Sequence, residues 1–305
     1  MACQGYIFYP GTLLAGPWLS CADFLAFIAH TGAWASTSQP LPRARLHVLR
    51  CCVLGVVFLG LHSTFAPKLP DRAFLSSGWV SHSLGFKLLY MWAMAFAARC
   101  KYYFVWLWAE AACVASGLAW SGTDWSRCRN IQPAGVELAT SAAVLASVWN
   151  TRTGLWLRHY VYERVAPPSR GPAPFWALLL TQTVSGVWHG VYAGYALFFL
   201  TSTLMFHASK VLFRYQRNLA GNVRRISDFA HGLLTAFHLS YSAAVFIAVT
   251  LPASRAAWAS VHYLGHVSMV CICLLGALVP AGKRREGGAR EDAPVPASGG
   301  RRKLT

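Results

Sequence analysis

Seven apolar runs divide the chain, and each is long enough, or nearly so, to form a membrane-spanning helix. A spanning helix needs roughly 20 mostly apolar residues. The longest run has room for a helix pair or a broken helix, so the pattern predicts an all-α polytopic membrane protein with seven or eight spans. The runs cover residues 46–65, 84–98, 102–120, 134–149, 174–206, 229–251 and 257–281.

The segments outside these runs have a different composition. Residues 1–45 hold one shorter apolar stretch, ADFLAFIAH, which predicts an interfacial segment. Residues 46–282 form the expected transmembrane core. Residues 283–305 are rich in Gly, Pro, Ala, Arg and Glu, which predicts a disordered basic cytosolic tail because such a composition cannot bury a core. The first residues lack a basic n-region, so we expect no cleavable signal peptide.

Composition and charge also favour a membrane protein. Only 12% of the 305 residues are charged, about half the share usual in soluble domains, and 55% are hydrophobic. The net charge of +17 would suggest nucleic-acid binding in a soluble chain. Here, however, alternate gaps between the runs hold 21 of the 27 basic residues, and the opposite gaps hold five. By the positive-inside rule the richer gaps face the cytosol, and we expect no nucleic-acid partner.

The few ionisable groups inside the runs are functional candidates, because a charge at membrane depth is costly. We expect Glu110 and Glu137 to pair with a neighbouring base or hydroxyl. Two of the histidines have the i, i+4 spacing of a metal pair, but no carboxylate or second pair accompanies them, so we expect no metal. Structural hydrogen bonds are expected for His231, His238, His262 and His266.

The segment VSGVWHGVYAGY, residues 184–195, carries a single histidine within an apolar run. Gln182, Ser185 and His189 follow at spacings of three and four, so one helix face carries all three. Glycines recur at every fourth residue from 186 to 194, which lets another backbone or a ligand approach closely. This pattern predicts the wall of a cavity within a helical bundle, with a hydrogen-bonded packing histidine as the alternative.

A second segment, WNTRTGLWLRHYVYER at 149–164, predicts a helix at the membrane–cytosol interface. A snorkelling basic helix is the simpler interpretation. Asn150 stands where a span ends and this helix begins, so capping the helix is one role open to it. One face carries Trp149, Thr153, Trp156 and Tyr160, and another carries Arg152, His159 and Glu163.

Together the two segments resemble the active-site regions of the membrane-bound O-acyltransferase (MBOAT) family, specifically its lysophospholipid acyltransferase branch. VWNTRTGLWLRHYVYERV is similar to the family segment with the active-site asparagine, and TQTVSGVWHGVYAGY to the segment with the active-site histidine. LLAGPW at 13–18 resembles the branch's Gly-Pro motif, and RCKYYFVWLWAEAACVASGLAWSG at 99–122 resembles its Lys-Tyr-Tyr segment. The four occur in family order.

The resemblance implies an MBOAT-type helical bundle around a transmembrane tunnel, in the endoplasmic reticulum, with Asn150 and His189 as the active-site pair. It implies acyl transfer from acyl-CoA to the free hydroxyl of a lysophospholipid, in contact with membrane lipids. Acyl-CoA would be a co-substrate, and no bound cofactor is expected. The expected substrate-binding residues are Arg152, Trp156, Arg158, Tyr160, Glu163, Arg164, Gln182, Ser185, Trp188, Tyr192 and Tyr195.

The chain departs from the family pattern in two places. Ala193 stands where the branch usually has proline. Family members also normally carry several more spanning helices before the Gly-Pro motif, so the chain is expected to be shortened at its N-terminus. A catalytically inactive MBOAT-like membrane protein, or a lipid transporter, is therefore the alternative function.

The expected chemistry is direct transfer. A hydroxyl attacks well only as its proton is removed, and His189 is the candidate base. Its apolar surroundings disfavour the imidazolium and keep the base neutral. The amide of Asn150 could donate a hydrogen bond to the oxyanion of the tetrahedral intermediate, or orient the substrate. Arg152, Arg158 and Arg164 lie on the expected cytosolic side, where anionic CoA would arrive.

Overall fold

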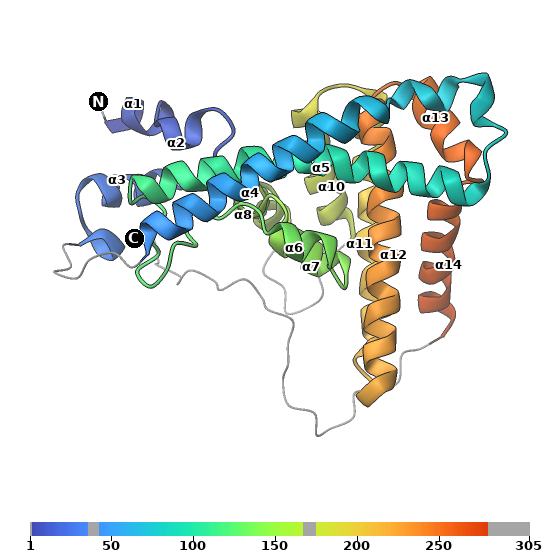
Figure 1. The fold of residues 1–305 in the computed structure, drawn as a ribbon. Helices are drawn as coiled ribbons and strands as arrows, with labels where there is room; N and C mark the ends of the chain where they lie inside the picture. Colours follow the sequence, from blue (N-terminus) through green and yellow to red (C-terminus); the bar gives the residue numbers. More distant parts are fainter. Residues whose placement is uncertain (1, 36–42, 167–174, 280–305) are drawn as a thin grey trace.

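The computed structural model describes residues 2–35, 43–166 and 175–279, and every regular element in these ranges is helical (Figure 1). The all-α fold class is therefore confirmed. Three short helices open the chain: α1 (Ala2–Ile7), α2 (Pro10–Leu13) and α3 (Cys21–Ile28). The apolar stretch ADFLAFIAH forms most of α3, which begins where the Ser20 hydroxyl accepts the N–H of Asp23 at 3.1 Å. The expected disordered tail from residue 283 lies outside the described residues.

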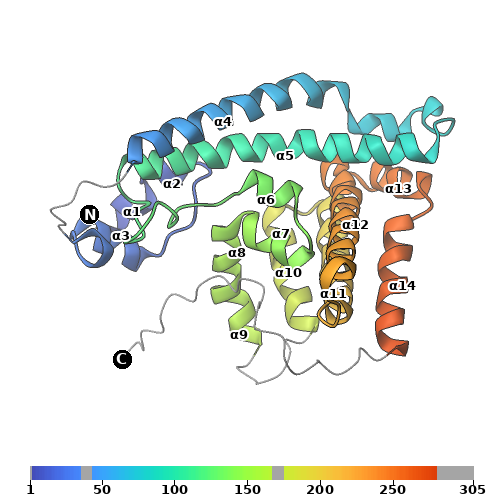
Figure 2. The same ribbon diagram turned by 60° about the horizontal axis from the view of Figure 1, so that its bottom comes forward.

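Helices α4 (Ala44–Phe65) and α5 (Leu84–Ala115) run side by side as a long antiparallel pair (Figure 2). The Ser83 hydroxyl caps α5 by accepting the N–H of Phe86. Gly55 allows the two helices to approach, because a Cβ there would lie 2.4 Å from the Trp108 ring. Three 3₁₀ turns join the pair: Ala66–Lys68, Asp71–Leu75 and Ser77–Trp79.

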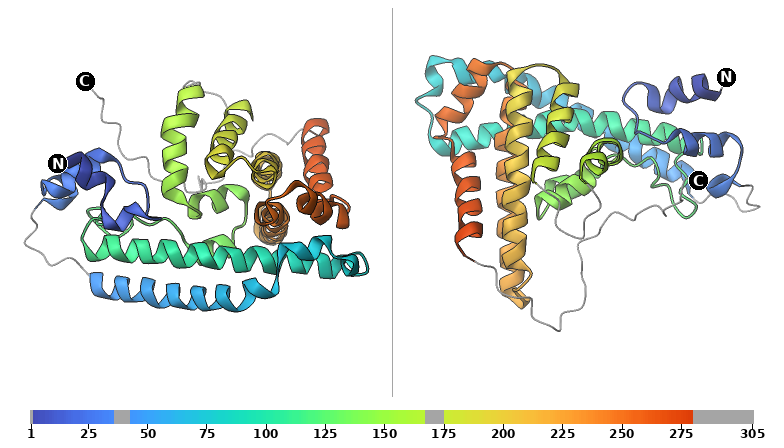
Figure 3. Two further views of the ribbon diagram at one scale, coloured as in Figure 1. Left: turned by 90° about the horizontal axis from the view of Figure 1, so that it is seen from above. Right: turned by 180° about the vertical axis from the view of Figure 1, so that it is seen from behind.

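The remaining helices lie on one side of this pair (Figures 2 and 3). The middle of the chain forms α6 (Pro133–Glu137), α7 (Ala142–Val148), α8 (Thr151–Leu157), a π-helical turn (Arg158–Tyr162), α9 (Glu163–Val165) and α10 (Phe175–His189). The last part forms α11 (Ala193–Gln216), α12 (Gly221–Ala248), α13 (Leu251–Ser260) and α14 (Leu264–Leu278). Helices α11, α12 and α14 stand steeply across the α4–α5 pair (Figure 1).

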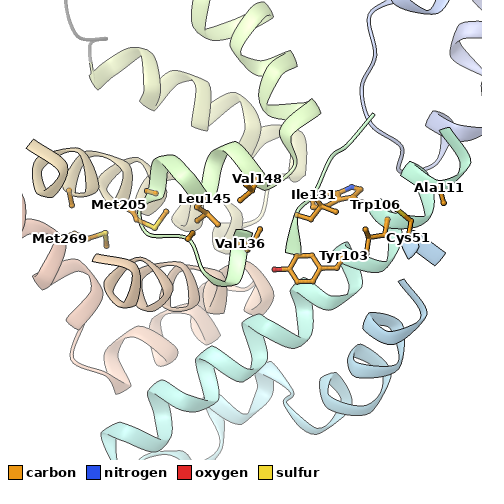
Figure 4. Packing of buried hydrophobic residues seen from close by; sticks show 14 residues of the cluster. Cys51, Tyr103, Trp106, Ala111, Ile131, Val136, Leu145, Val148, Met205 and Met269 are labelled. Atoms are coloured by element: carbon orange, nitrogen blue, oxygen red, sulfur yellow. The ribbon is translucent and has the colours of Figure 1, made fainter. Parts of the chain in front are cut away.

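A buried apolar cluster joins the helices at the centre (Figure 4). It extends from the α4–α5 pair through α6 and α7 to α11 and α14, so the segment leading to α8 is fixed against all of them. Burial of apolar surface of this kind is the main stabilising term in a fold. Its labelled members are Cys51, Tyr103, Trp106, Ala111, Ile131, Val136, Leu145, Val148, Met205 and Met269.

The expected seven or eight spans are not confirmed. Within the described residues, three helical stretches are long and apolar enough to cross a membrane: Ala44–Leu75, Ala193–Gln216 and Gly221–Ala248. A fourth results if α13 and α14, bent by 69° at their junction, are counted as one span. The chain is thus a multi-pass membrane protein with three or four candidate spans among its described residues.

The difference arises where apolar runs merge or break. Runs 84–98 and 102–120 form the single helix α5, which continues through Arg99 and Lys101. Run 134–149 divides into α6 and α7, of five and seven residues, which are too short to cross a bilayer. Run 174–206 breaks at Gly190, whose φ of 124° ends α10.

The buried Glu110 and the partly buried Glu137 find the partners expected of them. Glu137 accepts two hydrogen bonds from the Arg99 guanidinium, at 2.8 and 2.7 Å, and a third from the Tyr103 hydroxyl. Glu110 lies 2.8 Å from Nε2 of His47 and 3.6 Å from Nε of Arg129. Both predictions of charge pairing are therefore confirmed.

Three of the four histidines expected to be structural make interhelical hydrogen bonds. His231 bonds Ser209 and Gln216, His238 bonds Ser268, and His266 bonds Tyr241 and Thr201. His262 has a left-handed backbone at the turn between α13 and α14. Because this turn interrupts the helix, His262 and His266 do not share a continuous helical face.

Candidate active site

Asn150 lies at the junction between α7 and α8 and has a left-handed backbone, with φ 45° and ψ 46°. Asparagine tolerates this conformation better than most residues because its short polar side chain bonds locally. Asn150 occupies the N-cap position of α8, but its side chain makes no capping hydrogen bond. The backbone N–H of Arg152 is instead capped by the Asn130 side chain at 2.9 Å. The interpretation of Asn150 as a side-chain cap is therefore wrong.

The Asn150 side chain points its carbonyl oxygen at Asn130. Nδ2 of Asn130 donates to Oδ1 of Asn150 at 3.0 Å. Within residues 2–35, 43–166 and 175–279, Nδ2 of Asn150 has no hydrogen-bond acceptor. The amide is therefore held at one end while its donor end remains available to a ligand.

His189 is the last residue of α10, and Gly190 ends the helix directly after it. Its imidazole is surrounded by aromatic rings, with centroids 5.2 Å from Phe199, 5.3 Å from Phe246 and 6.0 Å from Tyr195. No described residue forms a hydrogen bond or ion pair with this imidazole, and the side chain is partly exposed. Among the described residues, the packing alternative therefore lacks the polar partner that would satisfy the ring.

The other predicted residues of this segment lie along α10 and at the start of α11. Gln182 and Ser185 lie on the same helix, α10, and Ser185 is buried. Tyr192 and Tyr195 pack their rings edge to face with centroids 5.7 Å apart. Ala193 begins α11, at a position where proline is favoured because its N–H would be unpaired anyway, so the departure from the branch motif leaves the helix start intact.

The repeated glycines act at two helix contacts and a helix end. Only Gly186 lies within α10, where a Cβ would approach the Phe199 ring to 3.1 Å. Gly194 donates its N–H to the carbonyl of Val249 at 2.8 Å, and a Cβ there would lie 2.3 Å from the carbonyl oxygen of Val245. The close backbone approach predicted for the repeat is confirmed at Gly194.

Two tryptophans connect the asparagine helix to the histidine helix. Trp156 of α8 and Trp188, next to His189, have ring centroids 6.5 Å apart. Both line a cavity of about 640 Å³ between the N-terminal helices, α8 and α10. Its wall is mostly apolar and includes Tyr6, Ile7, Thr12, Gly16, Pro17, Trp18, Leu19, Phe24, Leu118, Thr153, Trp156, Leu157, Val184, Val187 and Trp188. The Gly-Pro motif thus shares one cavity with both active-site segments.

Tyr102 of the Lys-Tyr-Tyr segment gives a second connection. Its ring packs on Trp149, next to Asn150, with centroids 5.8 Å apart. Tyr102 therefore joins α5 to the segment that ends at Asn150. Tyr102 was not among the predicted site residues, although the Lys-Tyr-Tyr motif that contains it indicated that this part of α5 belongs to the site.

The basic residues of the site segment serve different purposes. Arg152 donates from Nε to the carbonyl of Trp18 at 2.9 Å, and its guanidinium lies 5.7 Å from the Trp18 ring centre. Burial lowers the pKa of Arg152 from its usual value, but an arginine side chain in a protein stays charged. Arg152 therefore ties α8 to the Gly-Pro segment.

The residues of the π-helical turn form an exposed ion-pair group. His159 and Arg158 contact the Glu163 carboxylate at 3.0 and 2.9 Å and hold its pKa below the usual value. Tyr160 packs against Trp156 and Trp18. Arg164 is exposed and has no ion pair among the described residues. These side chains lie at the surface end of the segment.

Two residues that contact the site, Asn130 and Trp18, were not predicted individually from the sequence. Asn130 precedes α6 in a loop, and Trp18 was seen only as part of the Gly-Pro motif.

A separate group of side chains has ligand atoms of the kind that bind metals. Nε2 of His47, Sγ of Cys51 and a Glu110 oxygen lie within 4.8 Å of one another. Glu110 already accepts from His47, and the nearby Arg129 guanidinium opposes a further cation at this place.

Comparison with known proteins shows which family this chain belongs to. The family model described as "MBOAT, membrane-bound O-acyltransferase family" matches residues 1–247. Lysophospholipid acyltransferases 1 and 2 of Arabidopsis thaliana are 36% and 35% identical over 94% and 90% of this chain. A lysophospholipid acyltransferase of Schizosaccharomyces pombe is 31% identical over 86% of it. The matches cover 65%, 62% and 55% of those proteins' own lengths. The chain belongs to the membrane-bound O-acyltransferase family.

Proposed function

We propose that this protein is an acyl-CoA-dependent O-acyltransferase that transfers an acyl chain to the free hydroxyl of a lysophospholipid. Membership of the family and the names of the three relatives support the reaction class and the lipid substrate. The observation that carries the proposal is the Trp156–Trp188 contact, because it brings the Asn150 helix and the His189 helix to one cavity.

His189 acts as the general base. Its ring has no polar partner among the described residues, so a ring nitrogen can accept the proton of an incoming hydroxyl. The ring lies at the C-terminal end of α10, and the negative end of the helix dipole favours the imidazolium that forms as the proton arrives.

The reaction then needs one addition and one elimination. The hydroxyl oxygen forms a bond to the thioester carbonyl carbon as its proton moves to His189, giving a tetrahedral oxyanion. Nδ2 of Asn150 donates to this oxyanion. The carbon–sulfur bond breaks, the carbonyl reforms, and the CoA sulfur leaves with the electron pair and takes the proton from the imidazolium. The products are a diacyl phospholipid and free CoA.

The apolar cavity receives an acyl chain. Its lining of aromatic and aliphatic residues suits a hydrocarbon, and Trp188 at its wall adjoins His189. We place the exposed Arg164 and the Arg158 group on the cytosolic side, where the phosphates of CoA would meet guanidinium groups. We also assign the protein to the endoplasmic reticulum membrane, as the family resemblance implies.

A paired histidine substitution tests the function. Microsomes containing the wild-type chain, His189→Ala or His207→Ala are assayed with labelled acyl-CoA and lysophosphatidylcholine, lysophosphatidylethanolamine and lysophosphatidylserine in parallel. His207 is an exposed histidine on α11 that packs on Phe175, outside the site, and serves as the matched control. We expect His189→Ala to lose transfer to every acceptor and His207→Ala to keep it, at equal protein levels. A wild-type chain without transfer would favour the inactive or transporter alternative, whereas an active His189→Ala variant would show that His189 is not the base.

A further inference from the structure

Asn130 is buried and makes all of its described contacts with the start of α8. Its side chain is 2% exposed. Oδ1 accepts the backbone N–H of Arg152 at 2.9 Å, and Nδ2 donates to Oδ1 of Asn150 at 3.0 Å. Its backbone carbonyl accepts the N–H of Thr151 at 3.0 Å. One residue from a distant loop thus holds three successive residues at the active-site junction.

The backbone N–H of Arg152 determines which atom donates and which accepts in each of the side-chain hydrogen bonds of Asn130. A backbone N–H can only donate, so the Asn130 atom facing Arg152 must be the carbonyl oxygen. The other end of the Asn130 amide is then the NH₂ group, which can only donate as well. The Asn150 atom that faces it must therefore be Oδ1, and Nδ2 of Asn150 must point the other way.

The reverse orientation of Asn150 would be unfavourable. Two NH₂ groups would face each other beside a fully buried side chain, and both would lose a hydrogen bond. The αL backbone at Asn150 and the packed Trp149 ring fix the position of the side chain but not the direction of its amide. Among the described contacts, only Asn130 distinguishes oxygen from nitrogen at Asn150.

We propose that Asn130 is a positioning residue that turns the Asn150 amide so that its NH₂ group, and not its oxygen, faces the reacting carbonyl. This inference rests on the proposed function, because it assigns a use to the free donor. An amide oxygen in that place would repel the developing oxyanion, whereas the NH₂ group stabilises it. The backbone N–H of Arg152 thus determines, through the Asn130 amide, which end of the Asn150 amide faces the reacting carbonyl.

Asn130→Asp is the discriminating variant. It keeps the shape of the side chain and the oxygen that caps the Arg152 N–H, but it replaces the NH₂ donor that faces Asn150 by an oxygen acceptor. A carboxylate oxygen still accepts the Arg152 N–H, so α8 begins as before. The second oxygen cannot donate, and Asn150 must turn its NH₂ toward it. We expect kcat to fall by about 10²–10³, the loss typical of one oxyanion donor, with KM for acyl-CoA within about two-fold of wild type.

A double-variant comparison separates positioning from general support. If Asn130 acts through Asn150, then Asn130→Asp should cause no further loss of kcat in an Asn150→Ala background. Thr151→Val is the matched control, because it removes the bond from the Thr151 hydroxyl to the Arg129 carbonyl at the same junction and leaves the amide chain intact. It should stay within about three-fold of wild type, because the bond that it removes involves neither the Asn130 side chain nor the Asn150 side chain.

Several outcomes would overturn the inference. They are a kcat for Asn130→Asp within three-fold of wild type, an undiminished loss in the Asn150→Ala background, and failure of the aspartate variant to accumulate. The last counts against the inference because the Arg152 N–H and the turned Asn150 NH₂ should both donate to the buried carboxylate and so keep the protein folded. The proposed function fails separately, if the wild-type chain transfers no acyl group, and the catalytic roles of Asn150 and His189 fail if Asn150→Ala and His189→Ala both transfer at the wild-type rate. Inactive Asn150→Ala with fully active Asn130→Asp would refute the positioning role alone.

Discussion

The ion pair between Arg99 and Glu137 should be one of the most important polar contacts for the stability of this fold. It joins α5 to α6, just before the segment that leads to Asn150. The side chains of Arg99 and Glu137 are 7% and 27% exposed, and the pair is bidentate. Glu137→Gln leaves the guanidinium buried without a counter-charge, which is costly because the charge has already lost its water.

The expected loss in the free energy of unfolding depends on how deeply the pair is buried. Breaking a buried pair lowers this free energy by about 3–5 kcal/mol, and the partial exposure of Glu137 places this case near the lower end, at about 3 kcal/mol. A matched pair offers the contrast. Arg224 and Asp228 on α12 also form a close ion pair, in which Nε of Arg224 donates to both carboxylate oxygens, but their side chains are 33% and 34% exposed. Asp228→Asn should cost less than ~1 kcal/mol, as surface pairs do.

Thermal stability in detergent measures the difference. At about 2 °C per kcal/mol for a chain of this size, Glu137→Gln should lower the midpoint by roughly 6 °C and Asp228→Asn by less than about 2 °C. The midpoint is followed as the fraction of tagged protein that remains monodisperse after heating. The double change Arg99→Met with Glu137→Leu should be less harmful than Glu137→Gln alone, because no buried charge remains. Equal shifts for Glu137→Gln and Asp228→Asn, or a double variant worse than the single, would refute the reasoning.

Three further predictions concern the site, the packing and the topology. Asn150→Ser and Asn150→Asp should each lose at least about ten-fold in turnover at unchanged protein level, because neither replaces the amide donor; turnover within two-fold of wild type in the acyl-transfer assay would leave Asn150 no catalytic role. Gly194→Ala should lower the thermal midpoint, since its Cβ would meet the carbonyl oxygen of Val245 at 2.3 Å, whereas Gly60→Ala has open space and should not; an equal response of the two would show that α11 and α12 can separate freely. A protease-sensitive tag inserted in the turn at 217–220 should be cleaved from the cytosolic face of sealed vesicles, and protection would reverse the assigned topology.

Much of the fold class was readable from local sequence. The apolar runs and the low charge predicted membrane helices, and the partners of Glu110 and Glu137 followed from the cost of unpaired charge in an apolar setting. The number of spans was not readable in this way. Hydropathy does not say whether two runs fuse into one helix, as in α5, or break into short pieces, as in α6 and α7.

The site shows the same division between local and long-range information. The motifs around Asn150 and His189 identified the candidate pair, because residue type and spacing along one helix are properties of the sequence itself. Arg152 was expected to meet CoA, which stays a prediction, and the structure adds a bond from its Nε to the carbonyl of Trp18, 134 residues away. The contact that orients Asn150 comes from Asn130 across 20 residues.

The sequence by itself determined that this chain is an all-helical membrane protein with an asparagine segment and a histidine segment of the O-acyltransferase type. Those properties depend on composition, periodicity and short motifs, which act over a few residues. Only the tertiary structure decided that both segments reach one cavity, that Trp156 meets Trp188, and that the NH₂ of Asn150 is the free end of its amide. These facts depend on hydrogen bonds and packing between segments far apart in the chain, and no local pattern specifies which distant groups will meet.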